Sequence, residues 1–198
     1  MPRAKCTLYD PGIGVVLLAR WPGAGIDGGR TVGELVSNVD VLPSLLDAAG
    51  IPAPGAIQGR SFLPLLRGEA YDPRDAVYAE KTYHSYYDPM RAIRTAQHKY
   101  IRNFESAFLV EILGDIADGA IFRSDTQRYH GATHPATELY DLRSDPDEQQ
   151  NLAGDPAYAE VEQELDARLW AWMREFEDSL LLGPVRSPAY RHGVAAQG

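Results

Sequence analysis

The side chains that could do chemistry lie at three places along the chain: Lys5 with Cys6, the block around His84, and the pair His130 and His134. A lysine ammonium held against an anion stabilises the charge that develops as a bond breaks. A histidine among tyrosines could donate to a sugar hydroxyl or an oxyanion, and the tyrosine rings offer a flat apolar surface. Each residue also has an ordinary explanation: a solvated surface charge for Lys5 and a packed side chain for His84.

A zinc site at His130 and His134 is not predicted. Their spacing of four residues would suit two ligands on one face of a helix. Gly131 and Pro135 argue against a helix at this position, and no third ligand is evident. We therefore predict no metal site in this segment.

Composition bounds the class of protein. The 198 residues are enough for one domain, or two subdomains, with a buried core. A net charge of −9 argues against a nucleic-acid partner, which needs clustered Lys and Arg. No apolar run approaches the roughly 20 residues that span a bilayer, so we expect no membrane partner. Cys6 is the one cysteine, which excludes an intrachain disulfide and leaves the compartment open.

Residues 1–70 have the pattern of the last strand and helix units of a larger α/β layer. The uninterrupted apolar run Val15–Ala19 suits a strand that is buried on both faces of a parallel sheet. A helix follows, with Asp40 as its cap and Gly50 at its end. Its apolar side chains share one face that we expect to be buried: Leu42, Leu45, Leu46 and Ala49.

Residues 71–186 have a different pattern, that of a small antiparallel sheet packed by a long helix. Short strands are predicted at residues 76–80, 92–95, 99–103 and 137–142, and the middle two would form a hairpin around 96–98. Asp155 and Pro156 begin the helix, and Gly183 ends it. Its apolar stripe consists of Tyr158, Val161, Leu165, Leu169, Trp172 and Phe176. Residues 105–136 have no clear period and are predicted to form a long loop, and residues 187–198 a loose tail.

The chain resembles the C-terminal part of sulfatases. The order and spacing of several segments carry the resemblance over about residues 4–182, namely Lys5-Cys6-Thr7-Leu8-Tyr9-Asp10-Pro11-Gly12, Arg20-Trp21-Pro22-Gly23, and Glu138-Leu139-Tyr140-Asp141-Leu142 followed by Asp145-Pro146 and Asn151-Leu152. The block Glu80 to Arg91, which contains His84, is similar to a stretch of heparan N-sulfatases. The resemblance implies an alkaline-phosphatase-like fold. Residues 1–70 would then finish its large α/β domain, and residues 71–186 would form its C-terminal subdomain.

The resemblance also implies a reaction whose central groups lie outside this chain. Sulfatases hydrolyse sulfate esters or sulfamates with a formylglycine nucleophile, made from the first residue of Cys/Ser-x-Pro-x-Arg, beside a Ca²⁺ or Mg²⁺ ion. Cys6 lacks the Pro and Arg of that signature, and no serine here has them. The family's acidic metal-ligand segments (Asp-Asp, then Asp-Asn-Gly or Asp-His-Gly) are also missing. We therefore expect the chain to need an N-terminal sulfatase region, and to be inactive alone.

Two residues take roles from the resemblance: Lys5 would contact the sulfate, and His84 would line the substrate pocket. The partner would be a sulfated small molecule or glycan. Two alternatives stay open, a phosphoester hydrolase of the same superfamily and a non-catalytic domain that binds a sugar or an anion. Because an incomplete sheet leaves an unpaired edge, we also expect the isolated chain to associate or to be poorly soluble.

Overall fold

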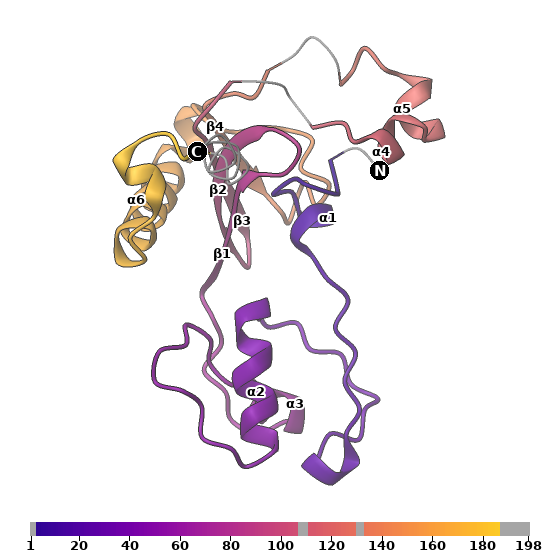
Figure 1. Cartoon of the computed structure of the whole chain (residues 1–198), viewed down its shortest axis with the longest axis vertical. Coiled ribbons are helices and arrows are strands. Elements are labelled where there is room, and N and C mark those ends of the chain that lie inside the picture. Colours follow the sequence, from indigo (N-terminus) through magenta and orange to yellow (C-terminus); the bar gives the residue numbers. More distant parts are fainter. Residues whose placement is uncertain (1–2, 107–110, 130–132, 187–198) are drawn as a thin grey trace, which may run out of the picture. The chain divides into compact units, whose positions relative to one another are not determined.

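The computed structural model describes residues 3–106, 111–129 and 133–186. The chain divides into two compact units: residues 15–77 form one, and the described parts of 1–14 and 78–198 form the other (Figure 1). Among the described residues, no helix has the length and apolar character to cross a membrane.

A four-stranded sheet is the centre of the larger unit, with the strands in the order β1 (Ala76–Tyr83), β2 (Tyr87–Thr95), β3 (His98–Asn103) and β4 (Thr137–Asp141). β2 pairs antiparallel with β3, and β3 with β4. Arg94 lies opposite Lys99, which leaves a tight turn at residues 96–97. The predicted hairpin is therefore confirmed.

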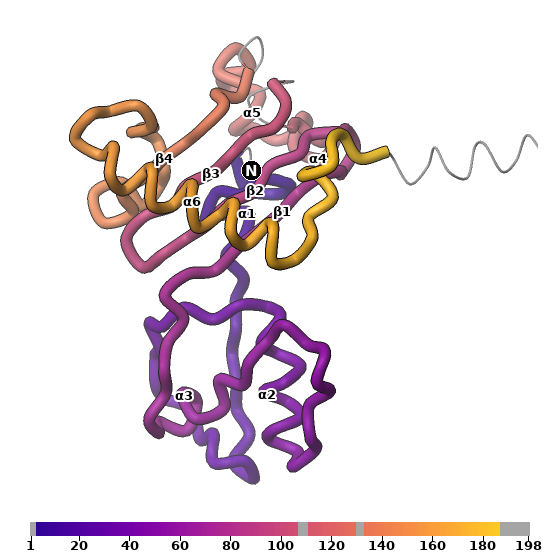
Figure 2. Tube along the Cα trace, turned by 90° about the vertical axis from the view of Figure 1, so that its left-hand side faces the viewer, coloured from indigo at the N-terminus to yellow at the C-terminus, as the bar shows by residue number. Residues whose placement is uncertain are grey.

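The long helix α6 (Ala159–Glu175) covers one face of this sheet (Figure 2). Asp155 accepts a hydrogen bond from the Ala157 N–H and so caps a 3₁₀ turn, η3 (Pro156–Tyr158), that leads into the helix. The residues that α6 buries are Leu165, Leu169 and Met173. The predicted sheet and its packing helix are confirmed, but α6 ends eight residues before Gly183, and a separate 3₁₀ turn, η4 (Ser179–Leu182), follows.

The opposite face of the sheet is covered by residues 3–14, here called the N-terminal segment, which ends in the short helix α1 (Asp10–Ile13) (Figure 1). Its apolar contribution is Leu8 and Tyr9, which pack on side chains of the three strands β2, β3 and β4: Met90, Ala92, Ile101 and Tyr140. Because successive side chains of a strand point to opposite faces, each strand serves both layers. On β2, for example, Met90 faces the N-terminal segment and Arg91 the side of α6, where it pairs with Asp178.

Residues 105–136 were predicted to form a long loop, but their described part contains two short helices, α4 (Gly114–Ala117) and α5 (Ala120–Ser124). Leu113, Ile116 and Phe122 form a small apolar cluster of their own, and Cys6 packs against it. These helices are too short to leave a helical period in the sequence, so the pattern could not indicate them.

The smaller unit contains the 3₁₀ turns η1 (Pro22–Ala24) and η2 (Asn38–Asp40) and the helices α2 (Val41–Ala48) and α3 (Leu63–Arg67). Asp40 precedes α2 as predicted, but its carboxylate mainly serves the surrounding loops. It accepts hydrogen bonds from the Ser37 N–H (2.9 Å), the Arg60 N–H (2.9 Å) and Arg74 Nε (2.7 Å). Burial alone would raise the pKa of Asp40, but Arg74 and these N–H groups outweigh that effect and lower it.

Two predictions for this unit were wrong. Residues 15–19 do not form a strand, and Val16 and Leu18 are 86% and 89% exposed. The apolar face of α2 is also open, with Leu42 and Leu45 more than half exposed, while Pro43 and Ser44 are buried. A central strand needs hydrogen-bonded neighbours, and an apolar helix face needs a sheet to cover it. Residues 15–77 by themselves provide neither for these two segments.

Candidate functional site

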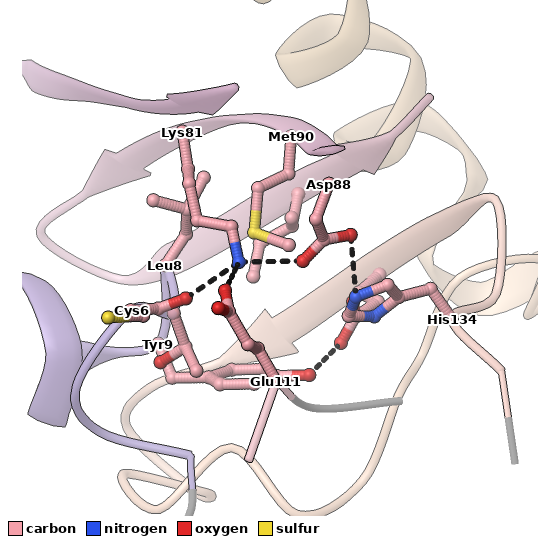
Figure 3. A pocket seen from close by; sticks show the side chains of 11 residues that line it. Cys6, Leu8, Tyr9, Lys81, Asp88, Met90, Glu111 and His134 are labelled. Atoms are coloured by element: carbon pink, nitrogen blue, oxygen red, sulfur yellow. Dashed lines mark hydrogen bonds and ion pairs between the residues drawn. The ribbon is translucent and has the colours of Figure 1, made fainter. Parts of the chain in front are cut away.

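A buried group of charged side chains lies where the N-terminal segment meets β1 and β2, with Lys81 at its centre (Figure 3). Lys81 Nζ lies 2.6 Å from Asp88 Oδ2, 3.1 Å from Glu111 Oε2 and 2.9 Å from the carbonyl oxygen of Cys6. These acceptors match the three protons of an ammonium group. Lys81 and both carboxylates are buried, so the contacts are made away from bulk water.

Both carboxylates are held in their ionised form. Burial alone would raise the pKa of Asp88, but the hydrogen bonds from His134 and Lys81 outweigh it and lower the pKa. Burial also opposes ionisation of Glu111, and the Ser85 N–H and Lys81 outweigh it in the same way. His134 Nε2 lies 3.3 Å from Asp88 Oδ1, on the far side of the carboxylate from Lys81.

The cavity inside this group has a volume of about 10 Å³, the size of a single water molecule. A sugar cannot enter it. A larger ligand could approach this buried group only from outside, and the two predicted site residues, Lys5 and His84, are both partly exposed.

Lys5, predicted to contact sulfate, lies at the surface with its Nζ 2.9 Å from Asp115 Oδ2 of α4. Both side chains are more than half exposed. The hydrogen bond from Lys5 raises the pKa of the ammonium and lowers that of the Asp115 carboxyl. An exposed pair of this kind is weak, because water screens it and two long side chains must be ordered to form it.

His84, predicted to line a substrate pocket, lies just after β1 and is 42% exposed. Its Nδ1 lies 3.2 Å from Glu111 Oε1, the same oxygen that accepts the Ser85 N–H at 2.9 Å. The structure thus joins the two predicted residues through one network: Lys81 bonds the backbone beside Lys5, and Glu111 links Lys81 to His84.

Cys6 has a backbone φ of +67°, in the left-handed region that non-glycine residues seldom adopt. This turn directs its carbonyl oxygen to Lys81. Burial raises the pKa of the Cys6 thiol, which leaves less of the nucleophilic thiolate at neutral pH. Both the surroundings of Cys6 and the absence of the Cys/Ser-x-Pro-x-Arg signature therefore argue against Cys6 as the nucleophile.

Within the described ranges, no three or more His, Cys, Asp and Glu side chains converge to hold a metal ion. Asp88 and Glu111 already surround the Lys81 ammonium, so their oxygens are not available to a divalent cation. His130 lies outside the described residues, and His134 is turned to Asp88.

A second buried network fixes the N-terminal segment on the sheet. Lys99 pairs with Asp10 and lies 2.7 Å from Glu148 Oε1, while Arg94 Nη2 lies 3.2 Å from Asp10 Oδ2. The hydroxyl of Tyr9 donates to Glu138 at 2.8 Å. The backbone that carries Lys5 is therefore attached at several points of the sheet.

A larger hollow of about 700 Å³ lies in the other unit, lined by residues between 15 and 36 and between 62 and 67. It contains neither of the predicted site residues. Its walls include the exposed run that was expected to be a strand.

Sequence reasoning missed three members of the buried group, Lys81, Asp88 and Glu111, and considered the fourth, His134, only as one half of a zinc pair. Lys81 and Asp88 belong to the His84 block, so the motif already contained them. Glu111 and His134 lie in the stretch predicted as a loop, and no local signal links them to residues 81–88. Such pairs become visible only when the chain is folded.

The fold and site define a class, the alkaline-phosphatase-like sulfatases, of which this chain has the C-terminal part. A solved structure of a 2-O GAG sulfatase superposes with a TM-score of 0.60 and 29% identity, covering 82% of this chain and 30% of that one. Residues 4–123 match the family described as N-sulphoglucosamine sulphohydrolase, C-terminal, and the chain belongs to that family.

Curated relatives agree with this assignment. An ulvan-active sulfatase of Formosa agariphila is 36% identical over 96% of this chain. The human N-sulphoglucosamine sulphohydrolase is 29% identical over 92% of it. The chain spans 39% and 41% of the lengths of these two relatives.

Proposed function

We propose that this chain is the C-terminal part of a sulfatase that hydrolyses sulfate ester or sulfamate groups of sulfated sugars. The observation that carries the proposal is the network from the Cys6 carbonyl through Lys81 and Glu111 to His84, which holds the two family-like segments together. The family assignment supports it, and the sulfatases reported above are named for ulvan, for GAG and for N-sulphoglucosamine.

Lys5 would contact the sulfate group. Sulfate ester hydrolysis builds negative charge on the leaving oxygen, and a nearby ammonium stabilises this charge more in the transition state than in the bound substrate. The ion pair between Lys5 and Asp115 is exposed and therefore weak. A negatively charged sulfate group can replace the Asp115 carboxylate, so Lys5 is available for this role. His84 would hydrogen-bond a sugar hydroxyl or a sulfate oxygen.

The nucleophile and the divalent cation would come from the remaining sulfatase region, which corresponds to the part of the relatives that this chain does not span. A formylglycine hydrate there would attack sulfur, and Ca²⁺ or Mg²⁺ would be held there. The described residues do not fit such an ion, because no three or more of their His, Cys, Asp and Glu side chains converge, and Asp88 and Glu111 surround Lys81. The role of this chain is to place Lys5 and His84.

The first test is the coding sequence upstream of the Met1 codon. We expect an in-frame Asp-Asn-Gly or Asp-His-Gly segment, with Cys/Ser-x-Pro-x-Arg before it. A stop codon with neither motif would overturn the proposal and favour a non-catalytic sugar- or anion-binding domain. An upstream Thr or Ser nucleophile without the signature would instead favour a phosphoester hydrolase.

The second test is Lys5→Ala in the protein that includes that upstream region. We expect kcat/KM for a sulfated monosaccharide to fall by about 10²–10³-fold, as when one charge-stabilising donor is removed. Lys5→Arg should keep part of the activity, because it retains the charge. Arg123→Ala removes another exposed, paired cation and serves as the matched control. Unchanged kcat/KM in Lys5→Ala would remove the assignment.

A further inference from the structure

We propose that Glu111 is a positioning residue: it fixes the imidazole of His84 and couples it to the backbone of the Lys5 segment through Lys81. The inference rests on the proposed function for the role of His84 toward substrate. Its structural part, the state of the imidazole ring, can be tested independently of any activity.

The two oxygens of Glu111 have separate tasks. Oε2 lies 3.1 Å from Lys81 Nζ. Oε1 accepts the Ser85 N–H at 2.9 Å and lies 3.2 Å from His84 Nδ1. The Glu111 side chain is completely buried, whereas the imidazole extends to the surface. Glu111 is thus a fixed interior anchor for a ring that solvent or substrate can reach.

The charge balance indicates that Glu111 does more than neutralise Lys81. Asp88 already supplies one negative charge at 2.6 Å from the ammonium. A second buried carboxylate is costly unless other donors satisfy it. Here those donors are the Ser85 N–H and His84 Nδ1, which lie in the loop between β1 and β2. The additional carboxylate therefore orders this loop and its histidine.

An ionised carboxylate can only accept hydrogen bonds, so a hydrogen bond between Glu111 and His84 Nδ1 requires a proton on Nδ1. The Ser85 hydroxyl also lies 3.2 Å from Nδ1 and is then a second acceptor for that proton. The neutral ring then has an unprotonated Nε2, which can accept a hydrogen bond from a sugar hydroxyl. If both ring nitrogens carry protons, Nδ1–H still donates to this carboxylate, and Nε2–H can donate to a sulfate oxygen. Glu111 thereby fixes which nitrogen is presented to a ligand.

Lys81 connects this arrangement to Lys5. One of its hydrogen bonds goes to Glu111 and another to the carbonyl oxygen of Cys6, the residue after Lys5. The left-handed backbone of Cys6 is what directs that carbonyl inward. A shift of Glu111 should therefore displace both His84 and the backbone that carries Lys5.

The ring state can be measured in the 198-residue chain labelled with ¹⁵N-histidine, by long-range ¹H–¹⁵N correlation at neutral pH. His84→Gln identifies the His84 signals among the five histidines. We expect the Nδ1–H tautomer in the unmodified chain. A predominant Nε2–H tautomer would overturn the proposal, and this outcome does not depend on how any Glu111 variant folds.

Glu111→Gln is the matching variant. Its amide oxygen should turn to the Lys81 ammonium and its NH₂ to His84, so the Nδ1–H fraction should fall. Glu164→Gln makes the same chemical change at an exposed site on α6 and should leave the His84 signals unchanged. An unaltered tautomer in a folded Glu111→Gln chain would overturn the inference.

In the protein with the upstream region, Glu111→Gln and His84→Ala should each raise KM, and the double variant should be no worse than the poorer single variant. Fully additive losses would contradict positioning through His84. If His84→Ala leaves KM and kcat unchanged, the proposed role of His84 fails, while the tautomer result still decides whether Glu111 fixes the ring.

Discussion

The ammonium group of Lys81 is buried and forms ion pairs with two buried carboxylates, those of Asp88 and Glu111. Removing the ammonium leaves Asp88 and Glu111 buried beside each other without their common partner. We expect Lys81→Met to lower the free energy of unfolding by about 3–5 kcal/mol, as for other broken buried ion pairs. Urea denaturation followed by circular dichroism measures this, with Arg123→Ala as the exposed control. A loss of under about 1 kcal/mol would show that the group contributes little to stability.

The ion pairs of Lys81 with Asp88 and Glu111 also predict how the free energy of unfolding depends on pH. In the folded chain the pKa values of Asp88 and Glu111 are lowered, because the hydrogen bonds from His134, Ser85 and Lys81 outweigh burial. Their contribution is thus complete above the ordinary carboxyl values of about 4 and is lost as the pH falls through the lowered values. The stability gap between the unmodified chain and Lys81→Met should therefore shrink from pH 6 towards pH 3. If urea titrations show the same stability gap across this pH range, Lys81 does not lower the pKa values of Asp88 and Glu111.

Single residues differ in how far the sequence can indicate them. Lys5 and His84 lie in segments that resemble segments of sulfatases, so the sequence alone could suggest a role for each. These two roles remain predictions. Glu111 and His134 have no such context. They meet Lys81 and Asp88 only because the stretch after β3 returns to the face where the N-terminal segment packs.

Elements with strong local patterns were predictable. Alternation and a tight turn indicate the hairpin of β2 and β3, and the Asp155-Pro156 start and apolar stripe indicate α6. The run Val15–Ala19 has an equally strong apolar pattern, yet it is not a strand here. An apolar run of this kind is typical of a strand that is buried on both faces of a sheet. Such a strand forms only if neighbouring strands hydrogen-bond to it, and the smaller unit by itself has none at this place.

The N-terminal segment gives a prediction at the scale of an element. A Cβ added to Gly12 would lie 2.4 Å from the carbonyl oxygens of Ala4 and Thr7, which are backbone atoms and cannot turn away. We expect Gly12→Ala to destabilise the larger unit by about 1–3 kcal/mol, as overpacking does. It should also reduce activity in the protein with the upstream region, because the segment carries Lys5.

Gly114→Ala is the matched control for Gly12→Ala, since a Cβ at this position at the start of α4 meets no atom within 4 Å. Thermal unfolding of both variants, monitored by tryptophan fluorescence, makes the comparison. If the two alanine variants have equal midpoints, the close approach at Gly12 has no energetic importance.

At the scale of the whole molecule, exposed apolar side chains concentrate in the smaller unit. They include Val15, Val16, Leu17 and Leu18 along the first run, and Val39, Leu42, Leu45 and Ile51 in and around α2. Single exposed apolar residues are ordinary, but extended apolar surfaces mark places that bind another surface. Of these, residues 15–18 belong to the run expected to form a buried strand, and Leu42 and Leu45 to the helix face expected to be covered. The proposed function gives them a partner in the remaining sulfatase region.

Alone, the chain should therefore associate. Burying apolar area is favourable by roughly 25 cal/mol per Å², and an extended backbone next to these side chains can pair with a second copy. We expect sedimentation velocity to show a mean mass that rises with concentration, and Val16→Lys with Leu18→Lys to lower it. Leu182→Lys, at a side chain 95% exposed on η4, is the control and should leave association unchanged. A monomer at every concentration, with one cooperative unfolding transition, would show that these surfaces need no partner.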